Sequence, residues 1–267
     1  IPSSLSATSN TLQNLFLYAQ TGTTKLSGSL DKFNAFHDLR KLYLYDNQFS
    51  GDLQWLDGSH IEMVDLQLHK NQIEGEIPDI LNQMVNLTTI YLYSNLLTGE
   101  LPPSISLLPN LLHLNVHDNS LSGEISPDFG NLASLEEFNI AKNEFTGFLP
   151  PELGNLINIT DFRVYENNLG GPIPPEYGQF SKCKYFYLWK NSFNGTIPLE
   201  LAGLTSIVII SVGDNLLTGS IPGDLFAAWA PTVVRIFLND NLLTGTIPPE
   251  INLLTKLNRI YVDNNDL

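Results

Sequence analysis

The sequence Leu111-Leu112-His113-Leu114-Asn115-Val116-His117-Asp118-Asn119-Ser120-Leu121-Ser122-Gly123-Glu124-Ile125 recurs in slightly changed form along almost the whole chain. Its central asparagine marks one position of a repeat. The equivalent asparagines are Asn47, Asn71, Asn95, Asn119, Asn143, Asn167, Asn191, Asn215, Asn241 and Asn265. Successive asparagines are 24 residues apart, except for a step of 26 residues between Asn215 and Asn241. Repetition at such a period predicts a solenoid of stacked, similar coils.

The shared pattern is N-x-L-x-G-x-I-P-x-x-L-x-x-L-x-x-L-x-x-L-x-L-x-x-N, and each of its positions has a physical reason. The L-x-L step alternates with period two, which is typical of a short strand with both leucines turned inward. The asparagine ends the strand, and its amide can bond the turn backbone of its own and the adjacent coil. The glycine, from Gly28 to Gly245 in ten coils, indicates a positive φ or a place without room for a Cβ atom. The proline indicates an extended corner, because it has no N–H to donate.

These motifs resemble the leucine-rich repeat family, and the L-x-G and I-P steps resemble its plant-type subclass. The resemblance covers essentially the whole chain. It implies an α/β repeat solenoid of about eleven coils, a right-handed superhelix or horseshoe with a parallel β-sheet on its concave face. It also implies extracellular recognition, as in receptor ectodomains, receptor-like proteins and inhibitors of cell-wall-degrading enzymes.

Composition and charge narrow the possible partners. Lys and Arg number 13 against 28 Asp and Glu, so the net charge is −15. This charge argues against nucleic acid and against direct contact with an anionic membrane, because both need clustered cations. No apolar run is long enough to span a bilayer. The oligomeric state is left open.

We expect residues 1–267 to form one leucine-rich repeat domain. Both ends fall inside a repeat unit, and the paired cysteines that usually cap plant-type ectodomains are missing. Two interpretations stay open: the chain is an excerpt of a longer protein, or its ends are closed in another way.

Three coils depart from the pattern. In the first, residues 18–25 form an extra loop, because Leu26 and Gly28 arrive late. In the second, Asp57 and His60 stand where leucines are expected, so we expect Trp55 and Leu56 to enter the core. The insertion Phe226-Ala227-Ala228-Trp229-Ala230-Pro231 predicts a convex helical turn that is stopped by the proline.

The strand residues that point outward carry the strongest functional signal. Outward positions lie six, four and two residues before each asparagine, because side chains alternate along a strand. Nine of the ten tyrosines fall in these columns: Tyr18, Tyr43, Tyr45, Tyr91, Tyr93, Tyr165, Tyr185, Tyr187 and Tyr261. The candidate ligand-binding residues are Tyr43, Tyr45, His69, Tyr91, Tyr93, His117, Arg163, Tyr165, Tyr187, Trp189, Arg235 and Arg259.

Two interpretations of the tyrosine columns remain. Tyrosine favours strands, and neighbouring rings stabilise a sheet by roughly 0.2–1 kcal/mol per pair, so the columns could simply stiffen it. Exposed rings with polar tips are also what recognition surfaces use. We favour binding, with Trp189 and Tyr165 as the main anchors.

Arg235 and Arg259 occupy one outward column, one coil apart. Two guanidinium groups so close predict a site for a carboxylate or another anion. Plant peptide receptors of the family often use an Arg-x-Arg pair on one strand for a peptide's C-terminus, but this chain has Arg-x-Phe and Arg-x-Tyr. The alternative is that Asp240 and Asp263 neutralise both arginines. The other charged residues, one before each asparagine, are expected to be solvated.

Three N-x-S/T sequons begin at Asn86, Asn158 and Asn194. We expect all three asparagines to face solvent, with Asn194 in the turn after its strand, which makes them candidate glycosylation sites; the alternative is that the sequons occur by chance. The single cysteine, Cys183, falls in the core register and is expected to be a small buried hydrophobe.

No catalytic, metal or cofactor site is expected. His113 and His117 share one side of a strand but stand about 13 Å apart, whereas metal ligands converge at about 2 Å. The sequence therefore predicts an extracellular, receptor-like module, secreted or on the cell surface, that binds a peptide, protein or glycan on its concave aromatic face. The alternative is a secreted interaction protein, such as a hydrolase inhibitor or a wall or matrix adhesion protein.

Overall fold

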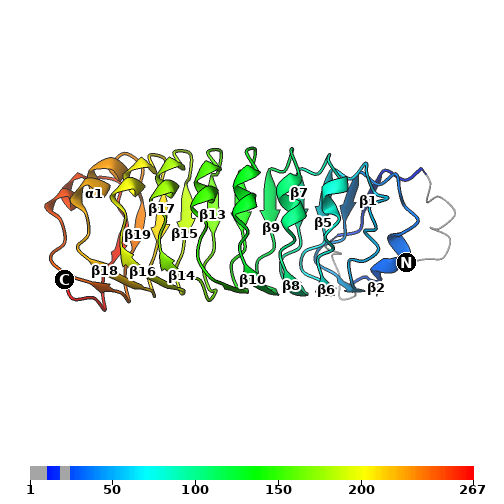
Figure 1. The fold of residues 1–267 in the computed structure, drawn as a ribbon, viewed down its shortest axis with the longest axis horizontal. Helices are drawn as coiled ribbons and strands as arrows, with labels where there is room; N and C mark the ends of the chain where they lie inside the picture. The colour runs from blue at the N-terminus through cyan, green and yellow to red at the C-terminus, as the bar shows by residue number, and fades with distance from the viewer. Residues whose placement is uncertain (1–10, 19–24) are drawn as a thin grey trace. The chain divides into compact units, whose positions relative to one another are not determined.

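The computed structural model describes residues 11–18 and 25–267, so residues 19–24 of the loop predicted over residues 18–25 lie outside the described residues. The chain separates into two compact units, residues 1–123 (unit 1) and 124–267 (unit 2). In each unit, consecutive coils stack through in-register parallel strands, which Figure 1 shows as arrows behind short helices. The prediction of an α/β repeat solenoid is confirmed within each unit.

The first sheet is built from the L-x-L segments. In unit 1 its strands are β1 (Asn14–Phe16), β3 (Lys41–Tyr43), β5 (Asp65–Gln67), β7 (Thr89–Tyr91) and β9 (His113–Asn115). In unit 2 they are β11 (Glu137–Asn139), β13 (Asp161–Arg163), β15 (Tyr185–Tyr187), β17 (Ile209–Ser211), β19 (Arg235–Phe237) and β21 (Arg259–Tyr261). Pairing such as Leu42↔Leu66 and Phe162↔Phe186 keeps equivalent residues side by side. Each outward position therefore forms a straight column within its unit.

A second parallel sheet, which the sequence analysis did not predict, forms at the L-x-G segments. In unit 1 it contains β2 (Ser27–Ser29), β4 (Gln48–Gly51), β6 (Gln72–Glu76), β8 (Leu96–Glu100) and β10 (Ser120–Glu124). In unit 2 the L-x-G segments form β12 (Glu144–Thr146) and a separate four-stranded sheet of β14 (Gly170–Pro172), β16 (Ser192–Thr196), β18 (Leu216–Gly219) and β20 (Leu242–Leu243). Gly99 has a φ of 78°, and a Cβ atom there would lie 2.7 Å from the Glu76 side chain. Both predicted reasons for the glycine therefore apply.

Short helices close the third side of the coils. The 3₁₀ helices are η2 (Leu30–Phe33), η3 (Leu81–Gln83), η4 (Pro103–Leu107), η5 (Pro127–Asn131), η6 (Pro151–Asn155), η7 (Pro175–Gln179), η8 (Leu199–Gly203) and η9 (Pro249–Leu253). Most begin at a proline, whose fixed φ suits a first helical turn. The insertion after Leu225 forms the single α-helix of the described residues, α1 (Gly223–Trp229), as predicted. The Trp229 indole N–H donates to the Leu201 carbonyl at 3.0 Å, which ties α1 to the preceding coil.

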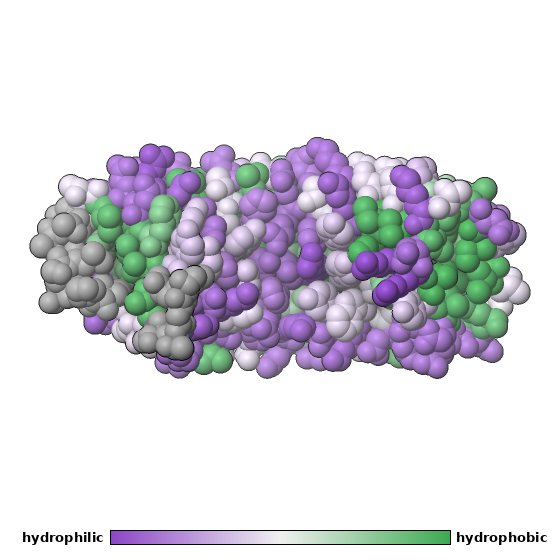
Figure 2. Space-filling model, turned by 180° about the vertical axis from the view of Figure 1, so that it is seen from behind, coloured by the Kyte–Doolittle hydropathy of each residue, from purple (hydrophilic) through white to green (hydrophobic). Residues whose placement is uncertain are grey.

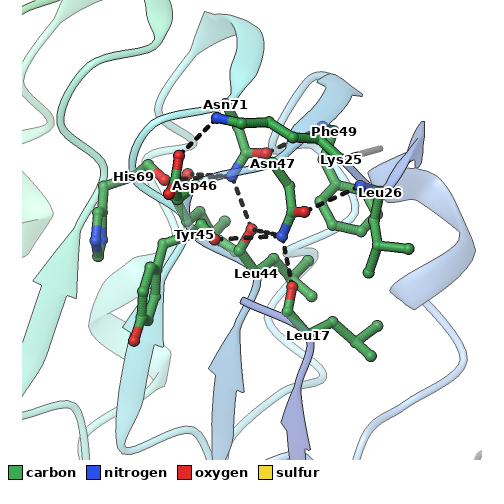
Figure 3. Close-up of polar contacts among 11 residues, drawn as sticks. Leu17, Lys25, Leu26, Leu44, Tyr45, Asp46, Asn47, Phe49, His69 and Asn71 are labelled. Atoms are coloured by element: carbon green, nitrogen blue, oxygen red, sulfur yellow. Dashed lines mark hydrogen bonds and ion pairs between the residues drawn. The ribbon is translucent and has the colours of Figure 1, made fainter. Parts of the chain in front are cut away.

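The repeated asparagines form the predicted column. Asn95 donates its amide N–H groups to the carbonyls of Leu92 in its own coil (2.9 Å) and Leu68 in the preceding coil (3.1 Å). Its Oδ1 accepts the N–H of Ile73 at 3.1 Å. Figure 3 shows the same pattern at Asn47 and Asn71, and Asn191 repeats it in unit 2. Each asparagine thus satisfies backbone groups of two coils that have no strand partner.

The core lies between the two sheets and the helices. Leu114 is fully buried, and in unit 2 the rings of Phe138, Phe162 and Phe186 stack with centroids 5.6 Å apart. Trp55 and Leu56 are buried in the irregular second coil, as predicted. Figure 2 shows hydrophobic surface at the C-terminal end of unit 2, where the last described coil has no coil stacked on it.

Candidate functional site

The outer face of each unit is the side of the first sheet that carries the residues six, four and two before each asparagine. In unit 1 the column two before the asparagine is an unbroken stack of five rings: Tyr18, Tyr45, His69, Tyr93 and His117. Successive ring centroids are 4.7, 4.4, 4.1 and 4.7 Å apart, and the planes differ by at most 17°. Figure 3 shows two of them, Tyr45 and His69, face to face.

In unit 1, the tyrosines four residues before the asparagine also make their polar and ring contacts within the chain. The Tyr43 hydroxyl donates to the Asp65 carboxylate, and burial, with this hydrogen bond as the second cause, raises the pKa of Tyr43. The Tyr91 ring meets His69 and Tyr93 edge-on, with centroids 6.0 Å away in both cases. The six predicted residues of unit 1 therefore come together, and each of their rings packs against at least one other ring.

His69 lies at the middle of this stack and is only 7% exposed. Its Nδ1 atom is buried without a hydrogen-bond partner. Burial, and secondarily the charge of Lys70, lowers the pKa of His69 to about 4. The imidazole is therefore neutral at physiological pH, and it acts as a flat ring in the stack.

In unit 2 the predicted residues form a different surface. Tyr165 and Trp189 stack at 4.7 Å and 8°. The Arg163 guanidinium makes two 2.6 Å hydrogen bonds to Asp161 and lies 5.3 Å from the centre of the Tyr187 ring. Arg163 is thus neutralised inside the chain and holds Tyr187 by a cation–π contact.

The ring columns of unit 2 stop at β17, where Ser211 and Gly213 occupy the outward positions. A recess of about 440 Å³ opens there. Its lining consists of Tyr187, Trp189, Ser211, Gly213, Asp214, Phe237, Asn239 and Asp240. Beyond it, Phe237 stacks on Tyr261 with centroids 5.2 Å apart. The sequence placed Ser211 and Gly213 in the outward columns, but the recess was not predicted. Two small residues at outward positions, between coils that carry large rings, could have indicated it.

Arg235 and Arg259 are paired directly across β19 and β21, and both are exposed. Neither makes an ion pair with any residue that the structure describes. Asp240, one of the two carboxylates that could neutralise them, accepts hydrogen bonds from the amides of Asn239 and Asn264, both at 2.6 Å, instead of forming an ion pair with either arginine. Unit 2 therefore presents two neighbouring cations that form no ion pair with a described carboxylate.

The remaining candidates lie away from this face. Asn86 and Asn194 are exposed, whereas Asn158 is half-buried, donates to the Ala133 carbonyl and accepts from Lys182. Asn194 lies within β16, so its predicted place in a turn is wrong, because the second sheet was not foreseen. Cys183 is fully buried, as expected, and burial raises the pKa of its thiol.

Two further observations concern the chemistry of the chain. Among residues 11–18 and 25–267, no three His, Cys, Asp or Glu side chains are grouped so that they could hold a metal ion. Within the same ranges, no helix combines the length and the apolar character of a bilayer-spanning segment.

Comparison with known proteins places this arrangement in a family. The model described as Leucine Rich Repeat matches residues 86–108, 110–132 and 134–156. No curated protein matches the chain. Among solved structures, the leucine-rich repeat ectodomain of the plant membrane receptor kinase GASSHO1/SCHENGEN3 from Arabidopsis thaliana, in complex with CASPARIAN STRIP INTEGRITY FACTOR 2, is 30% identical with a TM-score of 0.91. The match covers 99% of this chain and 34% of that one.

Two other solved structures are similar. The ectodomain of the Arabidopsis receptor kinase HAESA, in complex with an extended IDA peptide hormone ligand, is 26% identical with a TM-score of 0.81 over 99% of this chain and 47% of that one. A plant ice-binding protein is 24% identical with a TM-score of 0.74 over 90% of this chain and 76% of that one, a likeness of fold alone. This chain spans a third to a half of the two receptor ectodomains.

The repeats, the stacked parallel sheets and these matches define a leucine-rich repeat protein. Three of its repeats match the leucine-rich repeat family model, and the whole chain is similar to plant-type leucine-rich repeat ectodomains of receptor kinases.

Proposed function

We propose that this chain is the ligand-binding segment of an extracellular receptor-like protein and that a peptide binds across the outer face of unit 2. The observation that carries the proposal is the recess beside Trp189, together with Arg235 and Arg259, which are paired across β19 and β21 and form no ion pair with a described residue. Two similar proteins of known structure support it: the plant peptide hormone receptor RGFR1 in complex with RGF2, and the HAESA ectodomain in complex with an IDA peptide hormone.

The residues of unit 2 have separate roles in this proposal. Tyr165, Tyr187 and Trp189 supply flat apolar contact area with polar tips, which suits a peptide that lies across the strands. Arg235 and Arg259 bind an anionic group of the peptide, either its C-terminal carboxylate or an acidic side chain. Nothing in this arrangement needs a nucleophile or a general base, so we propose that the chain binds its ligand without transforming it.

The predicted residues of unit 1 take a different role. Tyr45, His69, Tyr93 and His117 cover one another in the ring stack, which leaves mainly ring edges for a ligand. We propose that this stack stiffens the first sheet of unit 1, and that the peptide anchors lie in unit 2.

The test is a selection of short random peptides displayed against the immobilised chain, followed by calorimetry of the recovered peptides. Trp189→Ala and Tyr165→Ala are each expected to weaken binding by at least about 2 kcal/mol, or about 30-fold, because anchors of this kind dominate an interface. Glu152→Ala, an exposed change on η6, serves as the control and leaves the affinity unchanged. If Glu152→Ala weakens binding and the two outer-face variants do not, the binding site lies away from the outer face of unit 2. If no peptide is recovered, the ligand is a protein or a glycan instead of a peptide.

An extracellular location follows from the same proposal. The similar receptor structures are ectodomains, and Asn86 and Asn194 are exposed sequon asparagines. Expression through a eukaryotic secretory pathway is expected to attach glycans at both, which peptide mapping before and after enzymatic deglycosylation will show. Asn158, whose amide already bonds Ala133 and Lys182, is expected to be occupied least. Unmodified Asn86 and Asn194 in secreted protein would contradict the assignment.

A further inference from the structure

The recess at β17 lies at a coil whose outward columns carry no ring. Tyr187 and Trp189 lie one coil before it, and Phe237 and Asn239 lie one coil after it. At the recess itself, Ser211 and Gly213 stand where rings would continue the two columns. We call this place, bounded by the lining residues given above, the Ser211 slot.

The thickness of the slot is set by the sheet. Neighbouring strands are about 4.8 Å apart, and Tyr165 stacks on Trp189 at 4.7 Å. One face of the Trp189 indole is covered by Tyr165, and the other borders the slot. A single flat group can therefore enter beside Trp189 over Ser211, because at Gly213 the Asn239 Oδ1 atom lies 2.9 Å from where a Cβ atom would stand.

The rim of the slot on the side where the strands end is anionic. Asp214 is exposed and makes no ion pair within residues 11–18 and 25–267. The nearest turn cation, Lys190, is bound to Glu166 at 2.9 Å. Hydrogen bonds from Asn239 and Asn264 lower the pKa of Asp240, so its carboxylate stays ionised at neutral pH. The cation Arg235 stands at the start of β19, about 7 Å before Phe237 along the strand, so it lies away from this acidic rim.

The floor of the slot carries an unused polar group. Ser211 lines the recess and is 7% exposed. Its hydroxyl forms no hydrogen bond with any described residue. A nearly buried hydroxyl without a protein partner is available to a ligand donor or acceptor that fills the slot.

We propose that the Ser211 slot binds the guanidinium group of an arginine side chain in the peptide ligand, an inference that rests on the proposed peptide-binding function. A guanidinium is flat, so it stacks on Trp189, and it is cationic with a fork of donors, so it pairs with Asp214. The chain already contains this combination, because Arg163 lies over Tyr187 while it makes two bonds to Asp161. Lysine lacks the flat face, and a neutral sugar lacks the charge.

The experiment uses three capped tripeptides, Gly-Arg-Gly, Gly-citrulline-Gly and Gly-Lys-Gly, titrated into the folded chain. Binding is followed by the indole N–H resonance of Trp189, which Trp189→Phe identifies. The arginine peptide is expected to shift this resonance and to bind about tenfold tighter than the citrulline peptide, which has the same shape without the charge. The lysine peptide is expected to be similarly weak, because it keeps the charge without the flat group.

Three variants locate the effect. Asp214→Asn removes the charge at constant shape and is expected to weaken the arginine peptide about tenfold. Ser211→Tyr fills the slot with a residue that this column accepts at Tyr187 and Tyr261, and it is expected to abolish binding. Asp118→Asn is the matched control, because Asp118 has the equivalent turn position and positive φ in unit 1. It is expected to leave binding unchanged.

Several outcomes overturn the inference. These are equal binding of arginine and citrulline peptides, full binding after Ser211→Tyr, and displacement of the arginine peptide by a methyl glucoside of equal or higher affinity. The citrulline comparison needs only the wild-type chain, so it decides the matter even if a variant does not fold. Random peptides that bind through Trp189 without selecting arginine would refute the slot and keep the proposed function. Failure of all peptides would refute both.

Discussion

His69 shows what a single residue contributes when a ring stack encloses it. It is packed between Tyr45 and Tyr93 at 4.4 and 4.1 Å, and burial lowers its pKa to about 4 from an ordinary 6.5. Between these values the unfolded chain binds a proton that the folded chain does not. The stability due to neutral His69 is therefore present above about pH 6.5 and is lost as the pH falls towards 4.

Urea unfolding between pH 7 and pH 4 measures this effect. His69→Phe keeps a flat ring in the stack and removes the titration, so the wild type is expected to lose more stability than the variant over this interval. Carboxylates titrate in both proteins and cancel in the difference. Parallel losses in the two proteins, or a His69 ring that titrates near pH 6.5 by NMR, would show that the imidazole is open to solvent.

At the scale of residues, the sequence predicted side-chain contacts correctly where a residue type has a single structural role. The asparagine bonds were predictable, because a turn after a strand leaves backbone groups bare in two coils and an amide can satisfy both. The residue before each asparagine was read as a solvated charge. From Asp46 to Asn264 it also adopts a positive φ of 52–57°. That could not be predicted, because Lys and Glu do not favour this conformation and only the closure of the coil imposes it.

At the scale of elements, the first sheet was predictable and the second was not. The L-x-L step carries the period-two signal of a strand, whereas the L-x-G step places a glycine inside β8 and a positive φ of 78° there. Because glycine weakens an isolated strand, the local sequence of the L-x-G step favours a turn over a strand. The second sheet exists because the first fixes the spacing of the coils, which brings the L-x-G backbones within pairing distance.

Leu114 tests the register of β9. It is fully buried and pairs across to Ile90 on β7. Leu114→Ala is expected to cost about 2–5 kcal/mol in the free energy of unfolding, because it opens a cavity between stacked coils. Leu107→Ala, on η4 with 62% exposure, is the control and is expected to cost less than about 0.5 kcal/mol. Chemical unfolding of both variants provides the comparison, and a similar small cost for both would mean that the register is shifted by one residue.

At the scale of the whole molecule, the residue types in the outward columns could be predicted from the sequence. Which of their rings are covered by a neighbouring ring could not. Alternation along a strand placed the tyrosines outward correctly. Whether a ring is covered depends on what the next coil supplies at the same position. Tyr93 meets the His69 ring on one side and the His117 ring on the other, whereas Trp189 meets Tyr165 on one side and the slot above Gly213 on the other.

This difference predicts that the same substitution has opposite consequences in the two units. Tyr93→Ala removes a ring with two stacked neighbours, so it is expected to lower the stability of unit 1 by about 1 kcal/mol or more and to leave peptide affinity unchanged. Trp189→Ala removes a ring with one open face, so it is expected to weaken peptide binding by at least about 2 kcal/mol with a smaller loss of stability. Urea unfolding and calorimetry with one selected peptide, applied to both variants, separate the two effects. If Tyr93→Ala weakens the peptide as much as Trp189→Ala does, the ring stack of unit 1 belongs to the binding site. If neither variant changes affinity, the rings of both units stiffen their sheets and the ligand binds elsewhere.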